Sequence, residues 1–347
     1  MILSCKILSY FLSCFLSIFM CFNNVYVLTY QNQNNFSIDI LSFQTLISFP
    51  DKVIDRQQFE DKITPSEFLK ILTHLHNNNY ILVKISDILD TSTNTIKFNP
   101  PIPLEKTPII LTFDNVSYTS NLTNSGSIDK IIVDRNNNLA TYSSKKSIQD
   151  RISYDNEFIP ILEDFIFNHP DFSYNSARGI IFCTGKDGLL GYNTNHNNAS
   201  ASHNTKRVCE VVSLLKSKGW EFGCNGYTYT PQHTLSNIEL IKDLNLWNKE
   251  IKPIVGNTNL FALPHTDTST PDTELSNLLT SNSFNIHFTN KPATHNITVN
   301  NNHIVCSRKI ISGHTLRTSP ESFSHLFNAE DVYDEIARNT PFNQLPI

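Results

Sequence analysis

Residues 108–113 read PIILTF, an almost continuous apolar run that stops at the polar pair Asp114-Asn115. Uninterrupted runs of this kind are typical of parallel strands that are covered on both faces, whereas half-exposed strands alternate apolar and polar residues. The same form recurs farther along the chain. The later apolar runs occupy residues 179–184, 220–224, 260–263 and 284–288.

Helical segments lie between these runs. Residues 64–67, TPSE, combine a capping threonine, a proline at the first helical position and an acidic third residue, which predicts a helix that begins there. Strand-like runs at residues 38–47 and 80–85 flank that helix, and a short helix is expected at 86–89. The alternation predicts a parallel α/β barrel or a doubly wound sheet, and 347 residues suffice for one barrel. Later helices are expected at residues 155–168, 207–218 and 236–247.

The polar residues that follow the strands are the candidates for chemistry. In parallel α/β folds, ligands and catalytic groups gather just beyond the carboxyl ends of the strands. Four loops therefore matter most. They contain Asp114-Asn115, residues 184–185, residues 225–229 and Pro264-His265.

Composition limits the classes of partner. The formal net charge is −5, the isoelectric point is near 6.2, and no Lys/Arg cluster is longer than Lys145-Lys146. A nucleic-acid partner is therefore not expected, because such proteins need a basic surface. The asparagine runs at residues 136–138 and 300–302 are interpreted as loop tips.

The N-terminus has the form of an export signal. A single Lys6 precedes an apolar run at residues 7–22, as in the charged and hydrophobic regions of a signal peptide. Residues 1–30 are predicted to be a cleaved signal peptide or an N-terminal membrane anchor, and residues 31–347 the folded domain. The expected location is secreted or cell-surface. Past this segment, free thiols are favoured over disulfides at Cys183, Cys209, Cys224 and Cys306.

Two of the strand-end loops resemble those of the polysaccharide deacetylases, the NodB-homology class of carbohydrate esterase family four. Residues 111–115, LTFDN, are similar to the family's T-F-D-D, whose first Asp is the general base and whose second binds the metal. Residues 220–229, WEFGCNGYTY, align with a strand that ends in H-[ST]-x-x-H, whose histidines bind the metal. The likeness runs in order from about residue 39 to the C-terminus. It implies a distorted (β/α) barrel of the NodB type.

The resemblance places Asp114 at the general-base position, and Asn115, Asn225 and Tyr229 at former metal-ligand positions. In active relatives zinc polarises an amide carbonyl and activates water while a carboxylate takes the proton. An amide oxygen is a weak neutral donor, and a phenol near pKa 10 must first lose its proton. Gly226 also replaces the family's Ser or Thr. No bound metal cofactor is expected, and catalysis is predicted to be lost or weakened, as in a pseudoenzyme.

The expected partner is an N-acetylated glycan or a peptidoglycan-like polysaccharide. The substrate groove of the family maps onto Tyr118, Tyr227, Pro264 and His265. The aromatic rings could stack on sugar rings through their apolar faces, or they could simply pack at the barrel mouth. Both interpretations are open.

Three alternatives remain at this point. Asp114 could serve only as a helix cap or a loop hydrogen-bonding residue. A metal site could have been rebuilt from the loop histidines together with Asp267, which would leave an active deacetylase. The protein could instead be a non-enzymatic interaction protein of the cell envelope. The histidines in question are His196, His203, His233 and His265.

Overall fold

The computed structural model describes residues 35–344 except 37, 54, 91–94, 97–101, 119–125, 196–197, 265–266, 268–270 and 294. The predicted signal or anchor at residues 1–30, and with it the possible membrane anchoring through residues 7–22, lies outside the described residues. Within the described part of the chain, every helix is too short or too polar to cross a bilayer.

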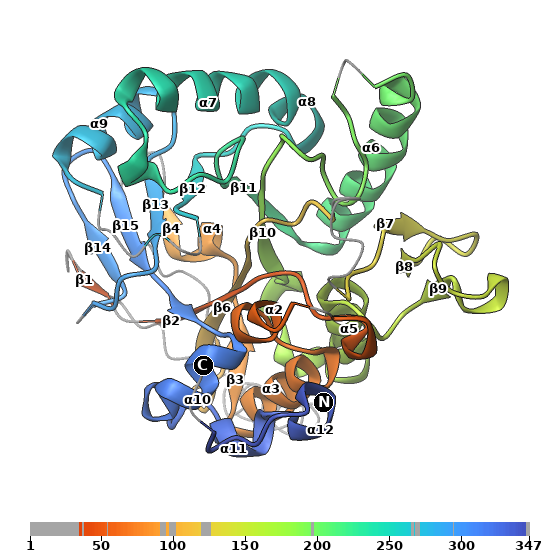
Figure 1. Ribbon diagram of the computed structural model, residues 1–347. Coiled ribbons are helices and arrows are strands. Elements are labelled where there is room, and N and C mark those ends of the chain that lie inside the picture. The colour runs from red at the N-terminus through yellow and green to blue at the C-terminus, as the bar shows by residue number, and fades with distance from the viewer. Residues whose placement is uncertain are drawn as a thin grey trace, which may run out of the picture.

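A curved sheet of mainly parallel strands forms the centre of the molecule (Figure 1). Going around it, β13, β12, β11, β10, β6 and β2 are neighbours, and every pair in that series is parallel. The apolar runs found in the sequence became these strands. Their bounds are Asp39–Phe43 for β2, Thr107–Phe113 for β6, Gly179–Cys183 for β10, Glu221–Cys224 for β11, Leu260–Ala262 for β12 and Ile286–Thr289 for β13.

One extended segment joins the two ends of this series. Its first part, β15 (Ile304–Ser307), runs parallel to β13, and its second part, β16 (Lys309–Ile310), runs parallel to β2. Arg308 lies where the segment changes partner. The distorted (β/α) barrel predicted from the sequence is thereby confirmed.

Two antiparallel strands extend the sheet beyond β15. β14 (Ile297–Val299) pairs with β15, and β1 (Asn35–Phe36) pairs with β14. The asparagines at residues 300–302 lie at the tip between β14 and β15, as predicted. The remaining strands are β3 (Tyr80–Leu82), which pairs with the start of β6, the pair β4 (Leu89–Asp90) and β5 (Thr95–Ile96), and a separate small sheet of β7 (Lys130–Val133), β8 (Leu139–Tyr142) and β9 (Ile152–Ser153).

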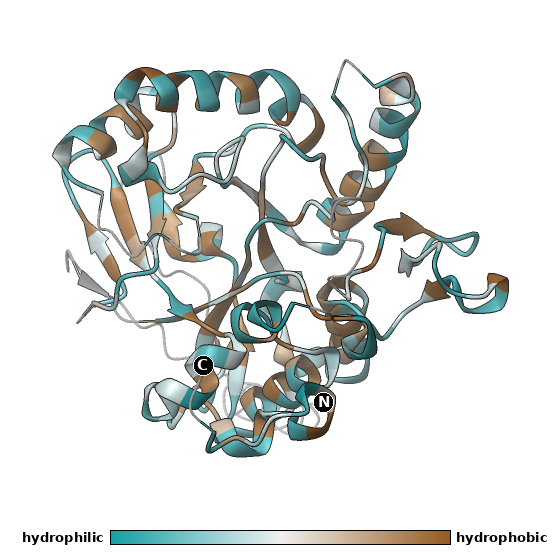
Figure 2. Ribbon diagram, viewed as in Figure 1, coloured by the Kyte–Doolittle hydropathy of each residue, from teal (hydrophilic) through white to brown (hydrophobic). Residues whose placement is uncertain are grey.

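The helices cover the outside of the barrel. α3 (Pro65–Asn77) begins with the predicted capping box, in which Thr64 and Glu67 each bind the other's backbone N–H. Figure 2 shows α7 (Asn237–Glu250) as a mixture of hydrophilic and hydrophobic residues, as expected for a helix with one buried face. The other helices are α2 (Gln57–Asp61), α4 (Ile85–Ile88), α5 (Phe158–Asn168), α6 (Ala201–Lys218), α7 (Asn237–Glu250), α8 (Lys252–Val255), α9 (Thr273–Ser281), α10 (Gly313–Thr318), α11 (Ala329–Val332) and α12 (Glu335–Arg338).

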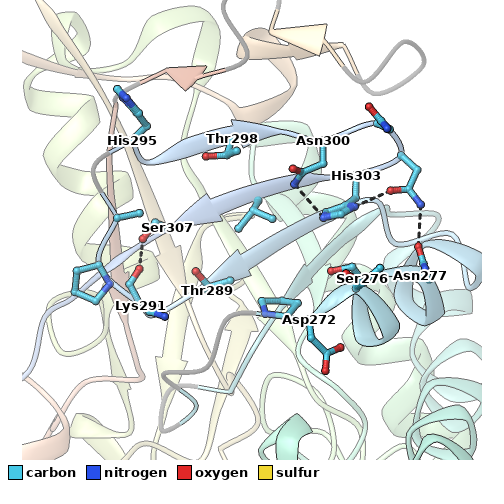
Figure 3. A pocket seen from close by; sticks show the side chains of 17 residues that line it. Asp272, Ser276, Asn277, Thr289, Lys291, His295, Thr298, Asn300, His303 and Ser307 are labelled. Carbon is cyan, nitrogen blue, oxygen red and sulfur yellow. Dashed lines mark hydrogen bonds between the residues drawn. The ribbon is translucent and has the colours of Figure 1, made fainter.

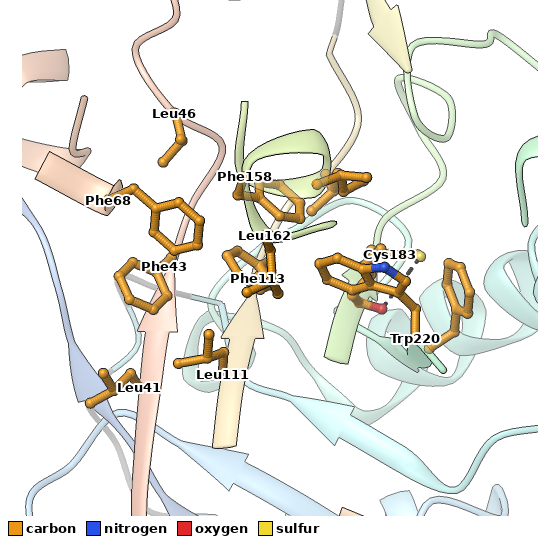
Figure 4. Packing of buried hydrophobic residues seen from close by; sticks show 14 of the residues in the cluster. Leu41, Phe43, Leu46, Phe68, Leu111, Phe113, Phe158, Leu162, Cys183 and Trp220 are labelled. Atoms are coloured by element: carbon orange, nitrogen blue, oxygen red, sulfur yellow. Dashed lines mark hydrogen bonds between the residues drawn. The ribbon is translucent and has the colours of Figure 1, made fainter. Parts of the chain in front are cut away.

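Two apolar clusters lie on opposite faces of the strands. Between the strands and the helices, Phe113 stacks on Phe158 with ring centroids 3.9 Å apart and also contacts Phe43 (Figure 4). The other cluster fills the barrel interior and includes Ile110 and Phe182. Because side chains alternate along a strand, Leu111 and Phe113 face the helices, whereas Ile110, Thr112 and then Asp114 face inward.

The C-terminal segment is fastened to the first long helix. The guanidinium of Arg338 is buried and donates through Nε to Glu67 Oε1 at 2.6 Å and through Nη2 to Glu67 Oε2 at 2.5 Å. The same carboxylate caps α3 by accepting from the Thr64 N–H at 2.8 Å. Cys183, Cys209, Cys224 and Cys306 are free thiols, as favoured from the sequence.

Candidate active site at the strand ends

Asp114, at the predicted general-base position, is buried in an ion pair at the end of β6. Arg308 donates from Nη1 to Asp114 Oδ1 at 2.7 Å and from Nη2 to Oδ2 at 3.0 Å, and both side chains are fully buried. Burial raises the pKa of the Asp114 carboxyl above its ordinary value, although the guanidinium acts in the opposite direction. Both carboxylate oxygens are therefore engaged by one cation, a geometry that fixes the side chain firmly.

Arg308 also binds the neighbouring strand ends. Its Nη2 donates to the carbonyl oxygen of Leu263 at 3.1 Å and to Asn290 Oδ1 at 2.7 Å. Asn290 in turn donates from Nδ2 to the Pro264 carbonyl at 2.9 Å. Side chains that follow β6, β13 and β15 thus form one buried polar network inside the mouth of the barrel.

Asn115 and Asn225, at two predicted former ligand positions, are in direct contact. The backbone N–H of Asn115 donates to Asn225 Oδ1 at 2.9 Å, and Asn225 Nδ2 donates to the Ala262 carbonyl at 2.9 Å. Asn225 is fully buried. Its amide therefore ties together the ends of β6, β11 and β12. The Asn115 amide oxygen accepts from the Thr184 hydroxyl at 3.3 Å.

Tyr229, at the third former ligand position, lies in the loop after β11. This loop turns through left-handed backbone at Gly226 and Tyr229, with φ of 75° and 59°. A Cβ on Gly226 would also lie 3.0 Å from Asp243 Oδ2, so the Ser or Thr of the family pattern would be strained here. The carboxylate of Asp243, on α7, holds the loop by accepting from the N–H groups of Tyr227 at 2.5 Å and Thr228 at 2.9 Å.

The predicted groove residues are mostly buried. Tyr118 is 4% exposed and Tyr227 is 6% exposed, and Pro264 is buried too. Tyr227 donates its hydroxyl to Glu250 Oε2 at 2.7 Å, and burial together with this bond raises the pKa of the phenol. His265 lies outside the described residues. The rings of Tyr118 and Tyr227 are part of the helix-side core, which favours the packing interpretation over sugar stacking.

These donors do not suit zinc. The three positions carry two amides and one phenol. Both the oxygen and the nitrogen of the Asn225 amide are already hydrogen-bonded to backbone groups. Zinc sites in proteins are built from thiolate, imidazole and carboxylate ligands. Among the described residues, no three His, Cys, Asp or Glu side chains come together in a metal-binding arrangement.

One histidine of the predicted alternative site has a carboxylate partner. His233 Nδ1 lies 3.2 Å from Asp267 Oδ1, and Asp267 is fully buried and also accepts from the Gln232 N–H at 2.8 Å. The His233 ring is 57% exposed. His203 is an exposed residue of α6, and His196 lies outside the described residues.

Sequence reasoning missed Arg308, Asn290 and Asp243. Asp243 had a local signal, because it lies on the buried stripe of α7 with Leu240, Leu244 and Trp247. A charged residue on such a stripe indicates a specific buried partner.

Comparisons with known proteins identify the fold. No protein-family model matches the chain, and no curated protein sequence matches it. A de-N-acetylase from Aggregatibacter actinomycetemcomitans superposes with a TM-score of 0.50 at 11% identity, covering 84% of this chain and 99% of that one. The Streptococcus pyogenes deacetylase PplD in complex with acetate gives 0.45 at 12% identity, over 81% and 95%. The BpsB deacetylase domain from Bordetella bronchiseptica gives 0.40 at 11% identity, over 81% and 98%. The superposition on the Aggregatibacter enzyme shows that the chain has the NodB-like fold of a deacetylase.

Proposed function

We propose that this protein binds an N-acetylated glycan and does not hydrolyse it through a zinc ion at the ancestral ligand positions. The observation that carries the proposal is the position of Asn225, whose amide joins three strand ends through backbone hydrogen bonds. In an active relative this position would hold an imidazole free to bind metal. Here the side chain supports the barrel mouth instead.

The neighbouring residues support the same interpretation. Asn115 and Tyr229 bring no formal charge at neutral pH, so they would not offset the cost of dehydrating a zinc ion. The carboxylate of Asp114 is held by Arg308. Hydrolysis by the mechanism of the active relatives needs a polarising metal and a base that can reach a water molecule. Asp114 alone satisfies neither requirement.

Metal analysis and acetate release test the proposal directly. Purified protein should contain far less than one zinc per chain after dialysis against zinc, and it should release no acetate from N-acetylglucosamine oligomers. Near-stoichiometric zinc, or acetate release that a chelator abolishes, would contradict the proposal that the protein does not act as a zinc hydrolase.

A restored variant serves as the positive control. Asn115→Asp combined with Asn225→His and Tyr229→His places a carboxylate and two imidazoles at the ligand positions, and it should gain zinc binding that weakens at acid pH as the imidazoles protonate. Because Asn225→His also removes the amide tie, folding must be checked by circular dichroism and thermal melting. A folded triple variant that gains no zinc would show that these positions were assigned wrongly.

A second candidate function is hydrolysis at a rebuilt site, and the His233–Asp267 pair favours it. A carboxylate at Nδ1 would leave Nε2 of His233 available as a base facing solvent. Acetate release by the parent that disappears in His233→Ala, but persists in the exposed α6 control His203→Ala, would favour this candidate over the binding protein.

The location of the protein is part of the same proposal. We propose export, on the grounds of Lys6 and the apolar run at residues 7–22. Fractionation of the native host tests this, and full-length protein found only in the cytoplasm would contradict it.

A further inference from the structure

The outer face of the sheet at β13, β15 and β14 carries mainly polar residues. The corresponding helix-facing side of strands such as β6 is apolar. The register aligns His287, Val305 and Thr298 across the three strands, with Thr289 and Ser307 two residues along. The opposite face of the same strands belongs to the apolar interior. Thr298 and Val305 are half-buried on this face, whereas His287, Thr289 and Ser307 are buried, so the polar row lies on a partly covered face of the sheet. Among the described residues between β13 and β15 there is β14 but no helix, so this connection does not cover the face.

α9 forms one wall of a groove over this face (Figure 3). The helix turns Thr273, Ser276 and Asn277 toward the strands, at the spacing that places residues on one side of a helix. The far end of the groove is formed by the tip between β14 and β15, and the cavity measures about 520 Å³. That volume is within the range of about 300–1,000 Å³ typical of small-molecule sites.

Three side chains at the tip and one on α9 form an ordered relay of hydrogen bonds. Asn300 Nδ2 donates to His303 Nε2 at 3.1 Å, and His303 Nδ1 donates to Asn302 Oδ1 at 2.8 Å. Asn302 Nδ2 then donates to Asn277 Oδ1 on α9 at 3.1 Å (Figure 3). An amide nitrogen can only donate and an amide oxygen can only accept, so these bonds require a neutral His303 with its proton on Nδ1.

The relay fixes the side chains before any ligand arrives. Burial lowers the pKa of His303, which supports the neutral form, and the His303 ring stacks on His287 at a centroid distance of 5.0 Å. The three hydrogen bonds of the relay therefore hold these side chains in place. They do not use the acceptor oxygen Asn300 Oδ1 or the donor nitrogen Asn277 Nδ2, which could bind a ligand. Groups held in place in this way lose less entropy on binding.

A buried polar atom in the groove wall has no partner. Ser276 is 1% exposed, and its hydroxyl oxygen makes no hydrogen bond in the structure although it lines the groove. Most buried hydroxyls are hydrogen-bonded, and an exception indicates a missing water or ligand. Ser276 is an observation independent of the relay, and it points to the same cavity.

We propose that this groove is a binding site for a neutral oligosaccharide. Hydroxyls and amides, which both donate and accept, match the hydroxyl groups of sugars, and the face of a neutral imidazole suits the C–H face of a sugar ring. Among the described lining residues Lys291 and Asp272 are the ionisable side chains other than histidine, and they have opposite signs. The groove therefore has no excess of one charge that would attract a strongly charged polymer.

The groove is separate from the strand-end site. Ser307 and Thr289 face the groove, whereas the next residues, Arg308 and Asn290, face the barrel interior. The proposal consequently does not depend on whether zinc binds at Asn115 and Asn225. It goes beyond the proposed function by placing saccharide recognition on the outside of the barrel.

Calorimetric titration of the full chain tests the proposal. The probes are tetrasaccharides of N-acetylglucosamine, glucose and mannose, with a sulfated heparin tetrasaccharide as the charged comparison. The parent should bind at least one neutral probe and prefer it to the sulfated one. Asn302→Ala, which cuts the relay, should weaken binding about 3- to 10-fold, as the loss of one or two neutral hydrogen bonds predicts. Thr298→Arg, which fills the groove floor, should weaken it by more.

Matched controls separate the groove from the strand ends. Asn136→Ala changes an exposed asparagine on the turn between β7 and β8 and should leave binding unchanged. His233→Ala, at the strand ends, should also leave it unchanged. Binding that is lost in His233→Ala and kept in Thr298→Arg would overturn the groove proposal while leaving glycan binding intact. Absence of binding to all three neutral probes, or preference for the sulfated probe, would overturn it too.

Discussion

The strand-end network and the outer groove share β13 and β15 but use their polar side chains in opposite ways. Inside the barrel, Asp114 and Arg308 bind each other through both carboxylate oxygens, and Asn225 binds the backbone of Asn115 and Ala262. On the outside, Asn300 Oδ1 and Asn277 Nδ2 lie beyond the bonds of the relay, and the Ser276 hydroxyl makes no hydrogen bond in the structure. The comparison teaches that polar side chains at the strand ends can hold the barrel together, whereas those in the groove keep donors and acceptors that a ligand could use.

If the inner network is structural, breaking its ion pair should have the largest effect on stability. Arg308→Met leaves the Asp114 carboxylate buried without a cation, and the free energy of unfolding should fall by about 3–5 kcal/mol. Urea denaturation measures the change. The double variant Arg308→Met with Asp114→Leu should recover a large part of the loss, because an apolar pair needs no cation. An unchanged single variant would break the comparison.

The second largest effect is expected in the pH dependence of the unfolding free energy, because of a buried carboxyl group on the helix side of the barrel. Glu157, the N-cap of α5, is fully buried and accepts from the N–H groups of Leu46 at 3.0 Å and Phe158 at 2.9 Å. Burial raises the pKa of its carboxyl from 4.5 to about 7. The folded state therefore favours the protonated carboxyl. The resulting gain in unfolding free energy is complete below about pH 4.5 and is lost as the pH rises through about 7.

Each pKa unit corresponds to about 1.4 kcal/mol, so the loss amounts to about 3 kcal/mol. Urea melts of the parent and of Glu157→Gln should be compared between pH 4.5 and 8. The parent should lose stability relative to the variant as the pH rises. Parallel curves would contradict the inferred burial of a titrating carboxyl.

Removal of the Asn225 amide should have an intermediate effect. Asn225→Ala leaves the Asn115 N–H and the Ala262 carbonyl without their partner, at a cost of about 1–3 kcal/mol in unfolding free energy. Asn302→Ala in the groove is the matched control, since its amide is exposed to water, and it should cost less. Equal costs at the two asparagines would show that the inner and outer clusters do not differ as described.

The smallest effect is expected at Ser276. Ser276→Ala removes a hydroxyl that makes no hydrogen bond, so the unfolding free energy should stay within about 0.5 kcal/mol of the parent or rise slightly. Oligosaccharide binding should weaken all the same. A clear loss of stability would mean that the hydroxyl has a structural partner after all.

The barrel and the gathering of the strand ends were predictable from local pattern. The run at 108–113 and its later repeats identified parallel strands, and parallel strands place Asn115 and Asn225 at one edge. The capping box at Thr64 was equally local. Local signals of this kind depend on neighbours in the sequence, so a single chain displays them.

The partners of these residues were not predictable in the same way. Arg308 binds Asp114 across 194 residues, and neither residue's neighbours indicate the other. Tyr118 and Tyr227 looked like groove residues, but their exposure depends on loop conformation, and Tyr118 has left-handed backbone with φ of 53°. The groove depends on the missing helix between β13 and β15, which becomes visible only when the strands are assembled.

Ring closure by the segment that contains β15 and β16 has a consequence for the timing of folding. β2 begins at Asp39, but its outer partner β16 begins at Lys309, and the bond from Lys309 Nζ to Asp39 Oδ1 joins residues 270 apart. Contacts of such high sequence separation form late and slowly. A ribosome must therefore finish nearly the whole chain before β2 finds its second neighbour. A product terminated before residue 304 would expose the edges of β2 and β13, the kind of edges through which chains aggregate.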